Sequence, residues 1–217
     1  MTKPNDADTA SADPQAAKTL TKAERTRIRI LEAAAYEFQK NGFAQTRISD
    51  IAKRAKTQAG SIYYHFESRD KIVFEVLRIA NAKTFEWVQE RLDRLPPDAS
   101  AKDRIAAAIQ GHLALVLSGD RFTRAHMRIF DQIPAEIRDH FLHVLDEYAD
   151  LWRQLFEQLR TEQAFRPEID PSVARLLLLG MLNWSIEWYR PGRLTVEQLG
   201  HQTTLLFLNG ISETDAG

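Results

Sequence analysis

The sequence predicts an all-α protein, and two observations support this fold class. Apolar residues recur three and four positions apart along nearly the whole chain, which is the period of an amphipathic helix. No stretch alternates apolar and polar residues as a half-buried strand does. Prolines and glycines divide the pattern into about nine helices. We therefore expect an N-terminal unit of three helices followed by a larger helical domain.

Length and composition limit the classes of protein that this chain can belong to. The 217 residues suffice for one or two domains with a substantial core, and 44% of them are hydrophobic. Since the chain contains no cysteine, disulfides, thiolate catalysis and zinc–thiolate sites are excluded.

Charge is distributed unevenly along the chain. Residues 20–70 contain ten Lys and Arg against six Asp and Glu, whereas residues 71–217 contain 17 against 21. The net charges are therefore +4 and −4, which favours nucleic-acid binding by the N-terminal part. The first 20 residues lack the apolar core of a signal peptide, and the uncharged apolar run 176–186 is shorter than the ~20 residues of a membrane span. We expect a cytoplasmic protein without a membrane partner.

The first elements are an arm and a helix. Residues 1–20 are polar and without an apolar period, which predicts a disordered arm. A helix is expected from residue 21 to 41, with Gly42 as its C-terminal stop. Arg25, Arg27 and Arg29 near its start are candidates for phosphate contacts or for simple solvation.

Residues 46–66 read as two short amphipathic helices joined by a tight turn. Apolar positions repeat on both sides of a three-residue break: Ile48, Ile51, Ala52 and Ala55, then Ala59, Ile62, Tyr63 and Phe66. Because the turn is short, the apolar faces must meet at a steep angle, and the outer face of the second helix is free to enter a DNA groove. That outer face is polar and aromatic and holds no carboxylate. The pattern predicts a helix-turn-helix.

Helical patterns continue to the end of the chain. A long helix is expected over 69–95, ended by Pro96-Pro97. Further helices are expected over 100–118, 121–133, 135–163, 172–189 and 195–209. His140 and His143 share one face of the predicted 135–163 helix, but no third ligand accompanies them convincingly, so a charged outer face is preferred to a metal site.

The last two predicted helices carry more apolar surface than one subunit needs. Residues 173–188 are apolar nearly all round, so their helix must be covered on every side. We expect a two-fold four-helix interface in a homodimer. Its candidate residues are Leu177, Met181, Trp188, Leu199, Thr203 and Leu206.

The run Gly60-Ser61-Ile62-Tyr63-Tyr64-His65-Phe66, followed by Arg69 and Lys71, resembles the signature of the TetR family of transcriptional regulators. The resemblance is strong over residues 23–77 and covers the remainder only in layout. One departure is Lys56, because members usually have glycine at this point of the turn. A positive φ at Lys56 would cost energy.

The resemblance implies a repressor that leaves its operator DNA when a small-molecule effector binds. It implies phosphate contacts through Tyr63, Tyr64, His65 and Arg69, with Arg47 and Lys56 flanking the same surface. Base reading would fall to Thr57, Gln58, Ala59 and Gly60. Gln58 suits an adenine edge, Ala59 a thymine methyl, and Gly60 permits close approach. The operator would be an inverted repeat in double-stranded DNA.

The tract from Asn183 to Gly192 is similar to the C-terminal part of TetR-type repressors that respond to acyl-coenzyme A thioesters. Such a ligand needs an apolar tunnel with aromatics and arginine at its mouth. Candidate tunnel residues are Leu113, Leu117, Met127, Phe130 and Trp152, and candidates for the polar end are Trp184, Arg190 and Arg128. The same tract is equally compatible with a packed helix end that supports the dimer.

Two other classes of function compete with a ligand-controlled regulator. A helical enzyme is disfavoured, since the chain has no nucleophile elbow, no glycine-rich phosphate loop and no dense histidine–carboxylate cluster, and no cofactor is expected. An architectural DNA-binding protein would not need so large a helical body. The predicted organisation is an arm over 1–20, a helix-turn-helix domain over 21–68, and an effector-binding and dimerisation domain over 69–217.

Overall fold

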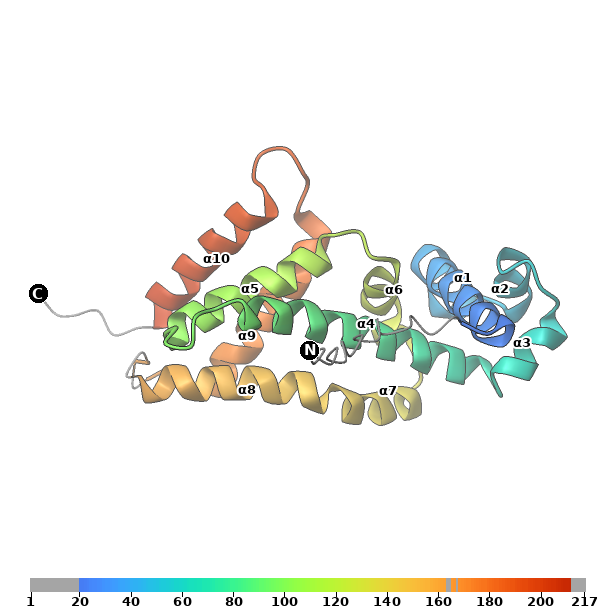
Figure 1. The fold of residues 1–217 in the computed structure, drawn as a ribbon, viewed down its shortest axis with the longest axis horizontal. Coiled ribbons are helices and arrows are strands. Elements are labelled where there is room, and N and C mark those ends of the chain that lie inside the picture. The colour runs from blue at the N-terminus through green and yellow to red at the C-terminus, as the bar shows by residue number, and fades with distance from the viewer. Residues whose placement is uncertain (1–19, 163–164, 167, 212–217) are drawn as a thin grey trace, which may run out of the picture.

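The computed structural model describes residues 20–162, 165–166 and 168–211, all of them helical or in turns and connections (Figure 1). The predicted arm over 1–20 lies outside these residues apart from Leu20. The α-helices are α1 (Lys22–Gln45), α2 (Ile48–Arg54), α3 (Ala59–His65), α4 (Arg69–Asp93), α5 (Ala101–Val116), α6 (Arg121–Ile129), α7 (Ala135–Leu142), α8 (Asp146–Thr161), α9 (Pro171–Trp188) and α10 (Val196–Ile211). Two 3₁₀ turns follow α6 and α7: η1 (Phe130–Gln132) and η2 (His143–Leu145). The predicted all-α class is confirmed.

The single helix predicted over 135–163 is wrong, because η2 interrupts it. α7 buries Phe141 in one apolar core, whereas α8 buries Trp152 and Leu159 in another. The 3₁₀ turn lies where the chain passes from the first core to the second. α1 also continues beyond its predicted end, although Gly42, with φ +75°, breaks its helical geometry at the predicted stop.

Two apolar cores organise the described residues. The first core joins α1, α2 and α3 to the N-terminal half of α4, to α6 and to Phe141 of α7. The second core joins the C-terminal half of α4 to α5, α8, α9 and α10. Figure 1 shows α4 running from the α1–α3 unit into the body, so this helix takes part in both cores. α6 packs against both α1 and α4.

A buried polar network ties three helices of the second core together. His112 of α5 is hydrogen-bonded through Nδ1 to the Tyr148 hydroxyl of α8 (2.7 Å) and through Nε2 to Oδ1 of Asn183 in α9 (2.9 Å). Because Oδ1 only accepts, Nε2 carries the proton and Nδ1 accepts from Tyr148. Trp152 is fully buried beside the His112 and Tyr148 rings.

This network predicts that the fold loses stability in mild acid. Burial lowers the pKa of His112 to about 4, and it also lowers the pKa of His126, packed between Phe130 and Phe141, to about 4. Both values lie below the unfolded value of about 6.5. The unfolded state therefore binds more protons between pH 6.5 and 4. The free energy of unfolding keeps its full value above pH 6.5. Between pH 6.5 and 4 it falls by about 1.4 kcal/mol per pH unit for each histidine.

Urea unfolding at pH 7.0 and 5.5 measures this loss. His112→Gln, which keeps hydrogen-bonding capacity but does not titrate, should show a smaller loss between the two pH values than the wild-type protein. Equal losses in the two proteins would contradict the role of His112.

Candidate nucleic-acid interface

A small cluster of buried apolar side chains holds the helix-turn-helix together. Ile51 and Ala52 of α2, Ala55 of the turn and Ile62 of α3 are buried, as is Phe66 directly after α3. These positions fall on the facing sides of α2 and α3, as the helical spacing predicts, whereas Ala59 and Tyr63, predicted on the same apolar face, are exposed. The opposite side of α3 is exposed among the described residues.

The turn between α2 and α3 contains Lys56 at φ +50°, the single positive φ outside glycine among the described residues. Two bonds hold the turn: the Thr57 amide donates to the Ala52 carbonyl (3.0 Å), and Arg29 Nε of α1 donates to the Ala55 carbonyl (2.7 Å). Arg29 is exposed, but its Nε is engaged in supporting the turn.

Lys56→Gly is expected to stabilise the protein by roughly 0.5–1 kcal/mol, because glycine adopts a positive φ without the strain that a Cβ introduces. Thermal unfolding measures the change as a rise of a few degrees. Lys53→Gly is a matched control: Lys53 is an exposed residue inside α2, where glycine should cost about 1 kcal/mol. A loss of stability in both variants would contradict strain at Lys56.

The free face of α3 presents amide, small and phenolic groups. Gln58, Ala59 and Gly60 are exposed, and Gln58 makes no side-chain cap bond although it is the N-cap residue of α3. Tyr64 is 84% exposed, with its ring edge against His65 at 5.2 Å. Apart from its chain neighbours and the adjacent helix backbone, no described atom lies within 4 Å of where a Cβ of Gly60 would be. The fold therefore does not require glycine at this position. The absence of a side chain matters only to a ligand that approaches this face closely.

Basic side chains around α3 differ in whether they are engaged by a neighbouring acidic or aromatic residue. Arg47, Lys53 and Lys56 are exposed. Arg54, in contrast, pairs with Glu37 and stacks on the Tyr36 ring. The three exposed cations give this surface its positive charge.

Arg69 is not free to hold a phosphate as predicted. Its guanidinium donates to the Phe43 carbonyl and lies over the Phe43 ring, with Cζ 4.0 Å from the ring centroid. Burial lowers its pKa. The sequence places Arg69 after the signature, but it does not reveal that the α1–α2 connection passes beneath it. Arg27 is likewise committed, to Glu75 at 2.9 Å.

The predicted effector residues do not form one site. Leu113 and Arg190 line a cavity of about 550 Å³ between α9 and α10. Leu117 packs on the second core, and Trp152 is fully buried in it. The remaining residues lie elsewhere: Met127 and Arg128 on α6, Phe130 in η1 against the first core, and Trp184 on the exposed side of α9. The sequence could not show that α6 packs on α1 instead of beside α9.

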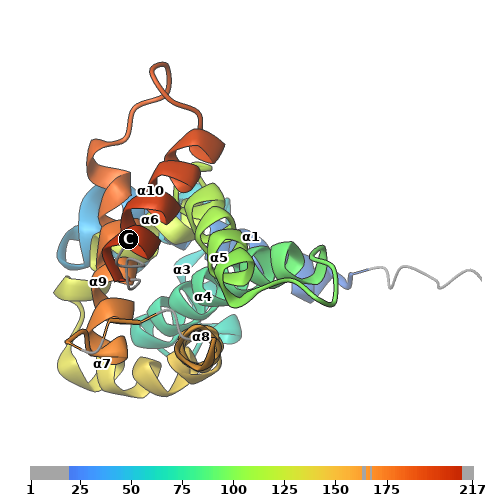
Figure 2. The ribbon, with the colours of Figure 1, turned by 90° about the vertical axis from the view of Figure 1, so that its left-hand side faces the viewer.

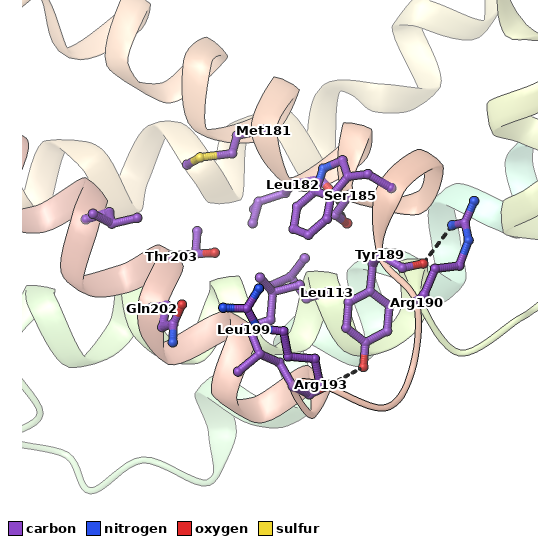
Figure 3. A pocket seen from close by; sticks show the side chains of 13 residues that line it. Leu113, Met181, Leu182, Ser185, Tyr189, Arg190, Arg193, Leu199, Gln202 and Thr203 are labelled. Atoms are coloured by element: carbon purple, nitrogen blue, oxygen red, sulfur yellow. Dashed lines mark hydrogen bonds between the residues drawn. The ribbon is translucent and has the colours of Figure 1, made fainter.

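The cavity between α9 and α10 has an apolar interior and a basic edge (Figure 3). Leu182 and Leu199 lie inside it with Leu113. Figure 3 shows Arg193 extending over the opening, while Arg190 turns toward the Tyr189 carbonyl, to which it donates at 2.8 Å. Arg193 was missed by the sequence analysis, although it lies only three residues after Arg190.

The predicted dimer residues divide between two faces. Leu177, Met181 and Trp188 of α9 and Leu206 of α10 are exposed. Leu199 and Thr203 are instead each only 8% exposed, because α10 turns them inward toward α5 and α9 of the same subunit. Trp184, assigned above to the effector, lies on the exposed α9 face at 66% exposure.

Comparisons with known proteins agree with the geometry of the helix-turn-helix. Residues 30–76 match the family model for bacterial regulatory proteins of the tetR family, and residues 98–211 match the tetracyclin repressor-like C-terminal domain. The HTH-type transcriptional repressor KstR2 of Rhodococcus jostii (strain RHA1) is 30% identical over 206 residues, which span 92% of this chain and 97% of the relative.

Solved structures give the same fold. The ketosteroid transcriptional regulator KstR2 of Mycobacterium tuberculosis superposes with a TM-score of 0.70 at 25% identity, covering 87% of this chain and 95% of that one. AibR in complex with isovaleryl coenzyme A and operator DNA gives a TM-score of 0.73 at 24% identity, covering 83% and 97%. The matched relatives are regulators and not enzymes. The chain therefore belongs to the TetR family of bacterial transcriptional regulators.

Proposed function

We propose that the repressor binds an inverted-repeat operator as a two-fold dimer in the cytoplasm and is released by an acyl-coenzyme A thioester. Two faces of one subunit carry the proposal: an exposed face of α3 without carboxylates, and an exposed apolar face on α9 and α10. The first suits DNA, and the second suits another copy of the chain.

On the DNA, α3 enters the major groove with its N-terminal residues toward the bases. Gln58 reads adenine with its amide, Ala59 meets a thymine methyl, and Gly60 lets the helix approach closely. Thr57 contributes from the end of the turn. Phosphates are held by the exposed residues Arg47, Lys56, Tyr63 and Tyr64 and by the partly exposed His65. Arg69 is left out of this set because it is committed to Phe43.

The dimer is supported by a stripe along α9. Val173, Leu177, Met181, Trp184 and Trp188 recur at spacings of three and four, and every one of them is exposed. Leu205 and Leu206 of α10 extend the same apolar surface. Figure 1 shows α10 at the end of the molecule away from α1–α3, and Figure 2 views α9 and α10 from that end. Monomers rarely leave such a surface open, and a two-fold copy covers it with its own equivalent.

The cavity between α9 and α10 is the proposed effector site. Its volume, about 550 Å³, lies in the range of small-molecule pockets. The leucine-lined interior suits an acyl chain, and Arg193 and Arg190 suit the phosphates of coenzyme A. Because Met181, Trp188 and Leu206 belong both to its lining and to the exposed face, the partner subunit would close the cavity.

A second groove favours a different effector. About 500 Å³ in volume, it lies between α4 and α8, where Glu86 and Glu147 accompany the Phe85 and Tyr148 rings. Its basic residue Arg78 is paired with Glu75 at 3.1 Å. Carboxylates beside aromatic rings suit an organic cation.

One titration distinguishes the two effectors. Operator-bound protein is exposed to acyl-coenzyme A esters of increasing chain length, to the free acids and to a panel of aromatic ammonium compounds. Release by an ester, weakened at least tenfold in an Arg190→Ala, Arg193→Ala variant, is the expected result. Release by a cation alone, abolished by Glu147→Gln, would transfer the effector site to the α4–α8 groove and leave DNA binding in place.

A further inference from the structure

Both backbone groups of Phe43, its N–H and its C=O, are hydrogen-bonded by residues of η1 and α4. Its amide donates to Oε1 of Gln132 (2.9 Å), across 89 positions of sequence. Its carbonyl accepts from Arg69, whose guanidinium also covers the Phe43 ring. Phe43 lies directly between the break in α1 at Gly42 and the start of α2. The segment that leads into the helix-turn-helix is therefore fixed by η1 and α4 together.

Gln132 has little freedom to release this contact. Its Nε2 donates to the Arg128 carbonyl (2.7 Å), so both ends of the amide are engaged. Gly42 makes room for it: a Cβ there would lie 2.7 Å from Oε1 of Gln132. At the other end of α6, Asp120 accepts from the Thr123 amide and pairs with Lys83 of α4. α6 thus connects α4 to the Phe43 peptide.

The Gln132 contact is at the surface, where a hydrogen bond contributes little to folding. Its geometric effect is larger, since α2 begins five residues after Phe43 and α3 packs on α2. Two reading helices in a dimer fit successive major grooves only if each is held at a fixed orientation on its subunit.

We propose that Gln132 is a positioning residue for operator binding: with Arg69, it fixes the Phe43 peptide and so sets the orientation of α2 and α3 on the body of the subunit. This role rests on the two-fold dimer proposed above. It concerns the match between two half-sites and not the contacts within one half-site.

The test uses full-length protein and a DNA duplex that the wild-type protein selects from random sequence. Affinity is measured for this duplex, for a version with one base pair inserted between the half-sites, and for a single half-site. Gln132→Met removes the acceptor for the Phe43 amide at similar size, and Gln132→Glu keeps an acceptor. Gln89→Met is the matched control, because Gln89 donates to Asp93 on its own helix.

Gln132→Met should lose on the order of tenfold affinity for the intact duplex, and should discriminate less against the insertion, with single half-site affinity and melting temperature unchanged. Gln132→Glu keeps the acceptor for the Phe43 amide but loses the donor to the Arg128 carbonyl, so it should lose less affinity than Gln132→Met, and Gln89→Met should behave as wild type.

Two results would overturn the inference alone: wild-type discrimination in Gln132→Met, or an equal loss on the intact duplex and the half-site. A wild-type protein insensitive to the insertion would instead overturn the two-fold arrangement, and this inference with it.

Discussion

Leu177→Glu is expected to convert the protein to a monomer and to reduce affinity for a two-half-site operator by at least a hundredfold. Leu177 is 67% exposed at the middle of the apolar α9 stripe, so a carboxylate there would be buried against its own copy at the two-fold interface. A monomer binds only one half-site. Linking two binding sites raises the overall affinity by roughly 10²–10⁴, and this gain is lost with the dimer. Light scattering and gel shift measure the two effects.

Leu142→Glu is the matched control for this substitution. Leu142 is an exposed leucine at the end of α7, outside the α9–α10 face. It should leave both the mass in solution and the operator affinity unchanged. A dimeric Leu177→Glu protein with full operator affinity would place the interface elsewhere.

Gly60→Ala is expected to separate stability from function. An alanine in α3 meets no atom of the protein and has the higher helix propensity, so the fold should gain up to about 1 kcal/mol. The added methyl group lies on the face that approaches DNA, and we expect operator affinity to fall by about tenfold or more, equivalent to at least ~1.4 kcal/mol. Thermal unfolding and gel shift on one preparation measure both quantities.

Gly210→Ala in α10 provides the comparison, because its Cβ also meets nothing within 4 Å. It should raise stability, and it serves as a comparison for stability alone, because Gly210 lies one helical turn after Leu206 of the proposed dimer face. Unchanged operator affinity in Gly60→Ala would show that α3 does not approach the bases through this face.

The DNA-reading face was more predictable than the rest of the molecule. Its residues lie within one local motif, where helical spacing alone decides that Ile62 is buried and Tyr64 exposed. Even the strain at Lys56 could be anticipated, because it follows from one missing glycine in a turn.

The effector and dimer residues depend on contacts between distant segments. Spacing along α10 identifies an apolar stripe, but it does not say that Leu199 faces α5 of its own subunit while Leu206 faces outward. Likewise, Phe130 is apolar in any arrangement, and only the packing of α6 on α1 assigns it to the first core. Arg69 shows the same limit for a charged residue, because its partner lies 26 positions away.

The continuous first core has a consequence for protein engineering. Ile72, Val73 and Val76 of α4 and Ala125 and Ile129 of α6 share one apolar interior with α1–α3. A fragment ending near residue 68 would expose that interior to water. Chimaeric regulators that exchange operator specificity with a relative should therefore transplant the matching surfaces of α4 and α6 together with the first three helices, since a junction at residue 68 would join two incompatible halves of one hydrophobic core.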